Sequence, residues 1–137
     1  EIFKLVNKNN DKKSIHLKKL NIFPKSWNNI TLEKNWKKII DIRNEANSSI
    51  EEMRANKIIG SSLEANIEIE LDEENYNLGK NYDFSEICIT SFAKITKAKD
   101  KENSIKVNTV KAEGQKCSVC WKINKNGCER HSCSNKN

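Results

Sequence analysis

Four of the five cysteines and one of the two histidines lie together at the end of the chain, in KCSVCWKINKNGCERHSCSNKN. Cys117 and Cys120 form a C-x-x-C pair, a spacing that lets two thiolates bind one metal ion at about 2.3 Å. Cys128 and His131 form a second pair, C-x-x-H. A tetrahedral Zn²⁺ site closes when two such pairs meet, and it then has no position left for a substrate water. The cluster therefore predicts one structural zinc ion per chain.

The fourth zinc ligand has a second interpretation, because Cys133 follows His131 closely. With Cys133 as the ligand, the pattern becomes C-x-x-C followed by C-x4-C, an all-sulfur site. With His131 as the ligand, Cys133 is a spare thiol near the metal. A pair of disulfides would use the same cysteines, but we disfavour it because the thiols are clustered in a Lys-rich chain without a secretory signal. Cys88 is far from the cluster in sequence and is expected to be a core thiol.

The residues around the expected zinc site have side chains that suit RNA. The indole ring of Trp121 could stack on an unpaired base of an exposed loop, such as an anticodon. The alternative for Trp121 is that its ring covers the zinc site and packs against the rest of the chain. Cationic side chains that could contact phosphates surround the site: Lys116, Lys122, Lys125 and Arg130.

Composition limits the chain to one modest core, or to a core with a metal-stapled lobe beside it. No stretch approaches the roughly 20 apolar residues of a membrane span. The 25 Lys and Arg exceed the 19 Asp and Glu, giving a net charge of +6. This charge suits a polyanionic partner without identifying it, and biased codon usage is an alternative account of the abundant Lys. The chain begins with Glu1 rather than Met, so we expect it to be a piece of a longer protein.

An amphipathic helix is predicted over residues 31–59, where apolar residues recur at spacings of three and four. The face that they define is expected to be core: Trp36, Ile39, Ile40, Ala46, Ile50 and Met53. Gly60 is expected to stop this helix, since glycine readily adopts positive φ. Arg54 could pair with Glu51 or reach a phosphate, and Arg43 has the same two interpretations. Upstream, Pro24 rules out a continuing helix, and His16 is expected to be a packed or surface group.

Alternation with a period of two predicts strands between residues 61 and 115. Residues 65–71 read as a half-buried strand, and residues 105–109 read as another. The more continuously apolar EICITSF, residues 86–92, is expected to be a buried strand. The stretch EENYNLGKNY reads as a short helix or turn. The predicted fold class is therefore α+β, with a long helix, a small sheet and a C-terminal zinc knuckle.

Three segments, in this order, resemble bacterial-type isoleucyl-tRNA synthetases. Residues 14–17 with Phe23 and Pro24 resemble that family's S-V-H-L…F-P stretch. Trp36 with residues 39–69 resembles a segment of the form W…R-x-E-V…L-E-x-x-R…K-x-I-G-x-S-L-E-A. Residues 112–121, AEGQKCSVCW, resemble the terminal zinc-binding segment, in which C-x-R-C-W is followed by a second C-x-R-C knuckle. Val119 departs from that pattern, since the family usually has Arg there, and His131 stands where a Cys is usual.

The resemblance implies three parts: the end of an anticodon-binding helical domain (1–60), an α/β junction (61–115) and a zinc-binding knuckle (116–137). It implies a cytoplasmic ligase that charges tRNA(Ile) with isoleucine using ATP. The family's two adenylate-forming signatures, of the H-I-G-H and K-M-S-K-S type, are missing, so no catalytic site is expected in this chain. ATP and Mg²⁺ would bind only in the parent enzyme. The implied partners are tRNA(Ile), at its anticodon end, and the other domains of the synthetase.

Two other classes of protein carry comparable cysteine patterns. A similar zinc knuckle ends the formamidopyrimidine-type DNA glycosylases, but that class does not account for the long helix or for KIIGSSLEA. A free-standing zinc-ribbon adaptor that binds nucleic acid or protein is the stronger alternative. Reading the DNA upstream of Glu1 distinguishes them, because an open frame with the adenylate-forming motifs decides for the synthetase.

Overall fold

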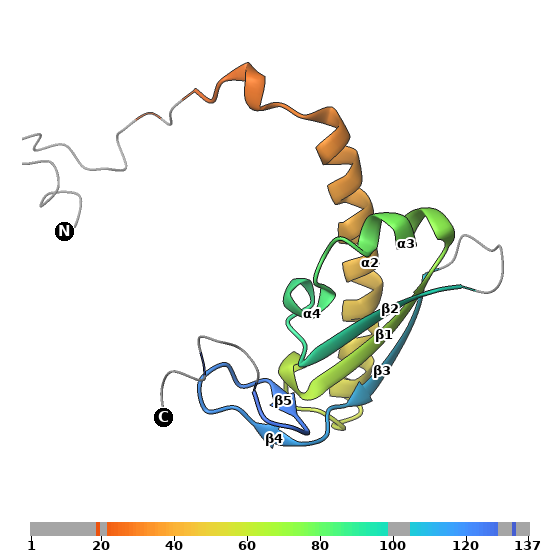
Figure 1. Ribbon diagram of the computed structural model, residues 1–137, viewed down its shortest axis with the longest axis vertical. Helices are drawn as coiled ribbons and strands as arrows, with labels where there is room; N and C mark the ends of the chain where they lie inside the picture. Colours follow the sequence, from red (N-terminus) through yellow and green to blue (C-terminus); the bar gives the residue numbers. More distant parts are fainter. Residues whose placement is uncertain (1–18, 20–21, 99–104, 129–132, 134–137) are drawn as a thin grey trace, which may run out of the picture. The chain divides into compact units, whose positions relative to one another are not determined.

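The computed structural model describes residues 19, 22–98, 105–128 and 133 (Figure 1). Two sequence predictions, for His16 and for residues 14–17, fall outside these residues, as do the candidate site residues Arg130 and His131. The chain forms two compact units, residues 1–30 and residues 31–137. None of the helices in the described part of the chain has the length and hydropathy that a bilayer span requires.

The described part of the first unit contains a short 3-10 helix, η2 (Lys25–Trp27), directly after Pro24. The fixed φ of proline suits the start of such a turn, and the amide N–H of Trp27 donates to the Pro24 carbonyl at 3.0 Å. The rings of Phe23 and Trp27 lie 5.7 Å apart. As the sequence predicts, no helix continues through Pro24.

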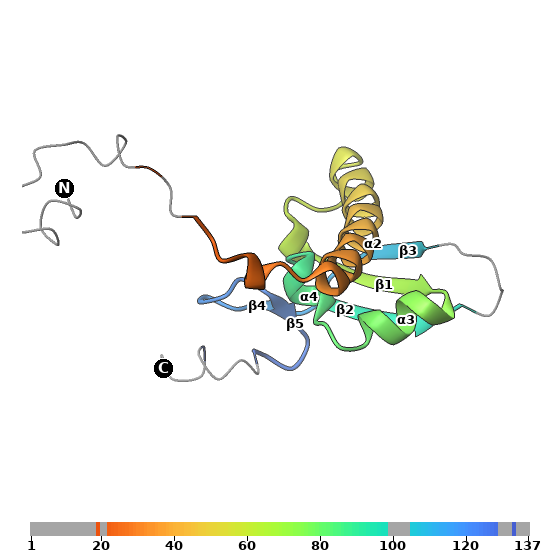
Figure 2. The same cartoon turned by 90° about the horizontal axis from the view of Figure 1, so that it is seen from above.

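Helix α2 (Ile30–Ala55) supplies one side of the hydrophobic core (Figures 1 and 2). Its buried residues follow helical spacing: Ile39, Ile42, Ala46 and Ile50. The predicted face is slightly misplaced, because Ile42 is buried whereas Trp36 and Ile40 are 41% and 47% exposed. Trp36 instead packs beside Tyr82, with ring centroids 5.6 Å apart.

The end of α2 corrects the expectation that Gly60 stops the helix. The helix ends at Ala55, and Lys57 takes the left-handed conformation, with φ of 58°. The Lys57 N–H donates to the Arg54 carbonyl and the Ile58 N–H donates to the Met53 carbonyl. These two bonds form a Schellman motif, in which a positive φ just past the helix satisfies its last carbonyls. A lysine rather than a glycine occupies that position here.

The two arginines of α2 make contacts within the protein. The Arg54 guanidinium pairs with the Glu51 carboxylate at 2.7 Å, which is the first of its two sequence interpretations. The Nε of Arg43 donates to the Ile87 carbonyl at 3.1 Å. Arg43 therefore connects α2 to residue 87, whereas the Arg54 pair lies at the surface within α2.

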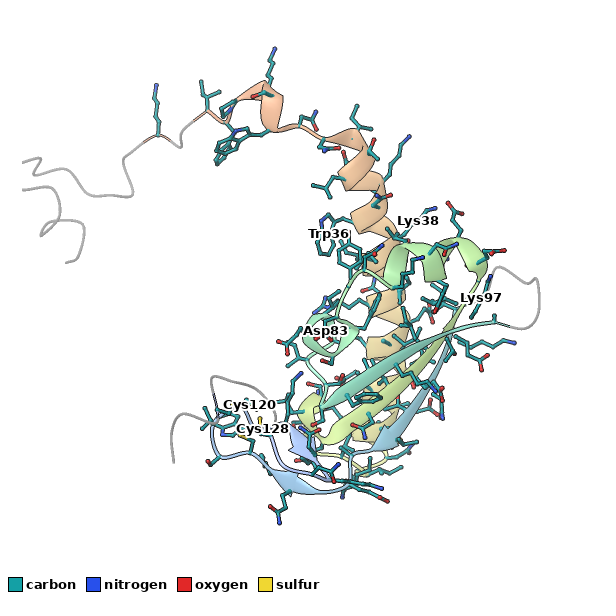
Figure 3. The ribbon with its side chains drawn as sticks, viewed as in Figure 1. Trp36, Lys38, Asp83, Lys97, Cys120 and Cys128 are labelled. Atoms are coloured by element: carbon teal, nitrogen blue, oxygen red, sulfur yellow. The ribbon has the colours of Figure 1, made fainter. Side chains whose placement is uncertain are left out.

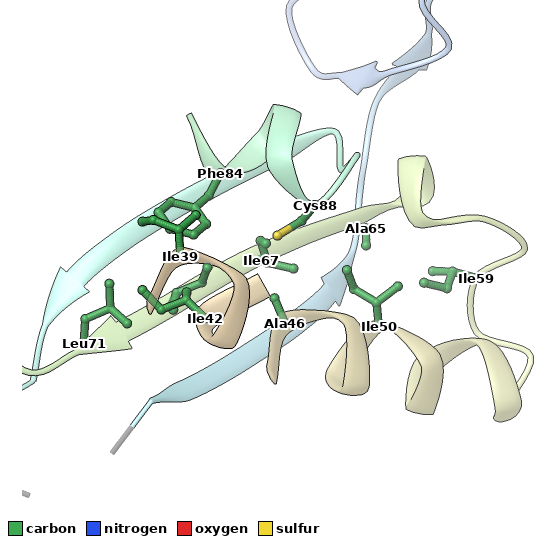
Figure 4. Packing of buried hydrophobic residues seen from close by; sticks show 11 residues of the cluster. Ile39, Ile42, Ala46, Ile50, Ile59, Ala65, Ile67, Leu71, Phe84 and Cys88 are labelled. Carbon is green, nitrogen blue, oxygen red and sulfur yellow. The ribbon is translucent and has the colours of Figure 1, made fainter. Parts of the chain in front are cut away.

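A three-stranded sheet has β1 (Ala65–Leu71) at its centre, entered through the short 3-10 helix η3 (Ser62–Glu64). β2 (Phe92–Lys97) pairs with β1 in parallel, and β3 (Lys106–Lys111) pairs with it antiparallel. Alternate β1 residues are buried against α2, as period-two patterning predicts (Figure 4). The predictions of strands at residues 65–71 and 105–109 are confirmed.

The connection between β1 and β2 corrects the prediction of a strand at residues 86–92. Parallel neighbours need a crossover, and α3 (Glu73–Gly79) and α4 (Phe84–Ile87) supply it. The Asp83 carboxylate caps α4 by accepting from the Ser85 N–H at 2.8 Å. Ile89, with φ of 56°, then turns the chain toward β2. Cys88 is buried in the core, as predicted, and burial raises the pKa of its thiol to about 11.

Candidate metal centre

The described part of the knuckle, together with Gly114 and Gln115 just before it, is built on a two-stranded ribbon of β4 (Gln115–Lys116) and β5 (Ile123–Asn124) (Figures 1 and 2). A tight turn joins the strands: the Trp121 N–H donates to the Cys117 carbonyl at 3.0 Å. The Cys117 N–H in turn donates to the Lys122 carbonyl at 2.9 Å. The turn therefore holds the C-x-x-C pair at the tip of the ribbon.

Four cysteines meet at this tip, and their sulfur atoms all lie within 4.8 Å of one another: Cys117, Cys120, Cys128 and Cys133. Figure 3 shows Cys120 and Cys128 side by side, and their Sγ atoms are 3.6 Å apart. A tetrahedral zinc ion with Zn–S bonds of about 2.3 Å requires sulfurs roughly 3.8 Å apart. The donor set and its spacing therefore fit Zn²⁺. His131 lies outside the described residues, so its part in the site is unchanged from the sequence prediction.

The electrostatics of the thiols favour a bound cation. The backbone N–H groups of Cys120 and Val119 lower the pKa of the Cys117 thiol to about 6, and the Val119 nitrogen lies 3.4 Å from that sulfur. Burial and the neighbouring sulfurs raise the pKa of Cys133 to about 12. One thiolate is thus stabilised by the protein, whereas further thiolates beside it need a positive ion.

Lys122 fixes the knuckle to the rest of its unit. Its side chain is only 10% exposed, and its ammonium lies 2.8 Å from the Glu86 carboxylate and 2.9 Å from the Ser85 hydroxyl. Both partners belong to α4. The sequence predicts that Lys122 faces a polyanion, whereas in the structure its ammonium is bound by Glu86 and Ser85. An ammonium held by two protein oxygens is poorly available to a phosphate.

Ser91 makes a second connection between the knuckle and the rest of its unit. Its hydroxyl oxygen accepts from the Ile123 N–H at 2.6 Å, and its O–H donates to the Leu63 carbonyl at 2.5 Å. Ser91 is 6% exposed, so both bonds are shielded from water. Sequence reasoning missed Ser85, Glu86 and Ser91 as site-positioning residues, since no local motif connects them to the cysteines.

The other candidate RNA contacts remain at the surface. The ammonium of Lys125 pairs with Glu113 at 2.8 Å, but both side chains are largely exposed. Lys116 is also exposed. Trp121 is 59% exposed and has a φ of 64°, a conformation that a bulky side chain rarely adopts. Arg130 lies outside the described residues.

Replacement of Lys122 by Met should loosen the knuckle without removing its metal ligands. The apolar stem is kept, but the ammonium bonds to Glu86 and Ser85 are lost. Charged hydrogen bonds of this kind contribute about 1.5 to 3 kcal/mol, so urea unfolding should show a loss in that range. Lys125→Met is the matched control, because its exposed pair should contribute less than about 1 kcal/mol. Equal losses in the two variants would contradict the docking role of Lys122.

Comparison with known proteins gives one consistent set of relatives, although no protein-family model matches the chain. The isoleucine–tRNA ligase of Pelagibacter ubique is 52% identical over 132 residues, covering 96% of this chain and 14% of that protein. The isoleucine–tRNA ligase of Zymomonas mobilis is 35% identical over 81% of the chain, and that of Agrobacterium fabrum is 33% identical over 82%. The chain spans 11% and 13% of these two proteins.

Proposed function

Since this chain is homologous to the C-terminal part of isoleucine–tRNA ligases, we propose that it is the zinc-binding, tRNA-contacting end of such an enzyme. The observation that carries the proposal is the four-sulfur cluster with an exposed Trp121 beside it. The whole enzyme would charge tRNA(Ile) with isoleucine, using ATP and Mg²⁺ in other domains. The residues of this chain would contribute recognition and no catalytic group. We place the enzyme in the cytoplasm, where protein synthesis uses it.

The segments then have separate origins within the enzyme. We assign residues 1–60 to the end of the anticodon-binding helical domain, 61–115 to the junction and 116–137 to the zinc-binding knuckle. Exposed apolar side chains at one-turn intervals along α2 support the first assignment: Leu32, Trp36 and Ile40. Such a stripe suits packing against further helices of the synthetase.

The metal is proposed to be a single structural Zn²⁺. Cys117, Cys120 and Cys128 supply three ligands, as the sequence predicts. We now favour Cys133 as the fourth, because its sulfur lies with the other three, and keep His131 as the alternative. The ion would hold the ribbon and the following segment together, which neither could do through a hydrophobic core of its own.

Trp121 is the proposed RNA-contacting group of the knuckle. A positive φ costs a residue with a Cβ about 1 to 2 kcal/mol, and the largely exposed ring regains little of this by burial. A stacked base would bury the ring. Lys116, Lys125 and Arg130 are proposed to contact phosphates, whereas Lys122 is proposed to position the knuckle through Glu86.

Binding of an isoleucine tRNA transcript to the zinc-loaded chain tests this function. We expect weak binding that falls steeply with salt, because Lys and Arg contacts release counterions from the phosphates. Trp121→Ala should weaken binding by roughly 1 to 3 kcal/mol if the ring stacks on a base. Lys116→Gln and Lys125→Gln should each reduce the salt slope by about one, with little effect on tRNA choice.

Trp121→Gly is the matched control for the strained backbone. Glycine tolerates positive φ, so this variant should be more stable than Trp121→Ala by about 1 kcal/mol, yet should bind tRNA equally weakly. In the intact ligase, isoleucine activation without tRNA should be nearly unchanged in both variants. A collapse of activation with intact tRNA affinity would overturn the assignment of the knuckle to tRNA recognition.

The two alternative classes explain less of the chain. A DNA glycosylase end or a free-standing zinc-ribbon adaptor accounts only for the cysteine cluster. Homology to isoleucine–tRNA ligases extends over 96% of the chain, including α2 and the sheet. A synthetase origin therefore accounts for the helix, the sheet and the cysteines together.

A further inference from the structure

The face of the sheet opposite α2 has a small hollow next to the knuckle. One row of paired strand residues forms its floor, with Asn66 of β1 between Phe92 of β2 and Val110 of β3. Phe92 is 53% exposed and Val110 is 48% exposed. The next row, Glu68 with Lys94 and Asn108, and Ile67 of β1 also line the hollow, which has a volume of about 190 Å³. An aromatic ring, aliphatic side chains, two amides and the ion pair of Lys94 with Glu68 thus surround one small space.

Asn66 marks this space as a site for a polar ligand. Its Oδ1 is buried and has no hydrogen-bond partner within the described residues. A buried acceptor left unpaired is unfavourable, so a ligand that donates a hydrogen bond to it is favoured. Rotation about χ2 of asparagine is soft, so the amide of Asn66, which lines the hollow, can adjust to a ligand there. Asn108 lies on the diagonal, about 7 to 8 Å away by strand geometry, and offers a second amide.

We propose that this hollow binds one unpaired nucleobase, an inference that rests on the proposed RNA-binding function. A planar base could stack on the Phe92 ring while its edge bonds to the Asn66 amide, since amides pair with the donor and acceptor groups of base edges. The hollow is smaller than the roughly 300 Å³ minimum of drug-sized sites, which suits a single ring system.

We expect this face to contact RNA differently from the knuckle, because the charged side chains on it are paired with one another. Lys94 pairs with Glu68 at 3.2 Å, and Glu70 lies opposite Lys106 in the strand register. The charges therefore balance, and the face does not attract phosphates strongly. The hollow also lies near the knuckle, because Phe92 directly follows Ser91, whose hydroxyl accepts from the Ile123 N–H of the knuckle. This position favours an RNA strand that contacts the knuckle and the hollow together. Stacking here would add to phosphate contacts made by the knuckle.

The test uses the zinc-loaded chain and single-stranded hexaribonucleotides of adenine, cytosine or uracil, with an abasic oligomer of equal charge as reference. Phe92→Leu keeps an apolar strand residue but removes the ring. It should weaken binding of the base-bearing oligomers about five- to a hundredfold and leave the salt slope unchanged. Asn66→Leu should reduce the differences among the three bases. Thr96→Val, on the same face two rows away, is the control and should bind as the parent does.

Each outcome decides the proposal. Unchanged affinity of the Phe92→Leu variant would overturn the nucleobase site. NMR shifts of the β1 amides that the abasic oligomer produces equally well would also overturn it. If Trp121→Ala still weakens binding in that case, the proposed function of the knuckle stands without the hollow. Hydroxyl-radical footprinting of the intact ligase supplies the remaining arm. Protection of Phe92 before RNA is added would mean that a protein segment covers this face, which also overturns the proposal.

Discussion

Zinc removal is expected to unfold the knuckle while α2 and the three-stranded sheet stay folded. Among its described residues, the knuckle has four sulfurs at its centre and exposed Val119 and Trp121 side chains, so we expect its stability to depend on the ion. Structural zinc contributes on the order of 10 kcal/mol to folding in small zinc-binding peptides. Ile42, Ile69 and Leu71 are fully buried in a core to which none of the four clustered cysteines belongs. Amide NMR spectra with and without a chelator measure both regions at once.

Metal analysis of two variants identifies the fourth zinc ligand. Cys133→Ser should lose zinc in metal analysis under reducing conditions, whereas His131→Ala should keep one ion per chain. The reverse result would assign His131 as the ligand and Cys133 as the spare thiol. Protein purified without any zinc would contradict the metal centre itself.

Gly114→Ala is expected to disrupt the ribbon almost as severely. Gly114 has a φ of 131°, and a Cβ placed there would lie 2.3 Å from the Asn124 carbonyl oxygen and 2.6 Å from the Lys125 nitrogen. Both atoms belong to the backbone at the end of β5, opposite the start of β4, so relief of the clash requires β4 and β5 to separate. We expect a loss of about 3 to 5 kcal/mol, at the high end for single substitutions.

Gly127→Ala is the control, since Gly127 also has positive φ but no atom of the described residues would lie within 4 Å of its new Cβ. Gly127→Ala should lower the free energy of unfolding by only about 1 to 2 kcal/mol, because alanine is strained at positive φ. Competition with a metallochromic chelator gives zinc affinity, and urea unfolding gives stability. Similar losses in both variants would mean that conformation alone, rather than contact with Asn124, makes Gly114 necessary.

Local patterns predicted the parts of this fold that depend on neighbours in sequence. The apolar spacing of α2 and the alternation in β1 and β3 are such patterns. The close sequence spacing of Cys117, Cys120 and Cys128 likewise predicted that these residues lie together. The prediction failed at residues 86–92, because a short apolar run does not distinguish a buried strand from a helical turn. There the capping carboxylate of Asp83 and the positive φ of Ile89 decided the structure.

The contacts that position the knuckle could not be predicted in this way. Lys122 meets Glu86 only because the crossover places α4 beside the ribbon, and Ser91 meets Ile123 for the same reason. Lysine in a basic, cysteine-rich segment has the same local signature whether it faces RNA or a carboxylate. Burial of its ammonium is a property of the tertiary fold, and the sequence patterns report only local order.

The strand order has a consequence for synthesis on the ribosome. β1 is the central strand, yet it is made before both of its neighbours. Until residues 92–97 and 106–111 emerge, both edges of β1 lack their partners, and unpaired strand edges invite association with other chains. α2 is complete before β1 is translated and can cover the apolar side chains of Ile67 and Ile69 at once. The long helix would thus cover the apolar face of the nascent β1 strand before β2 and β3 have been made.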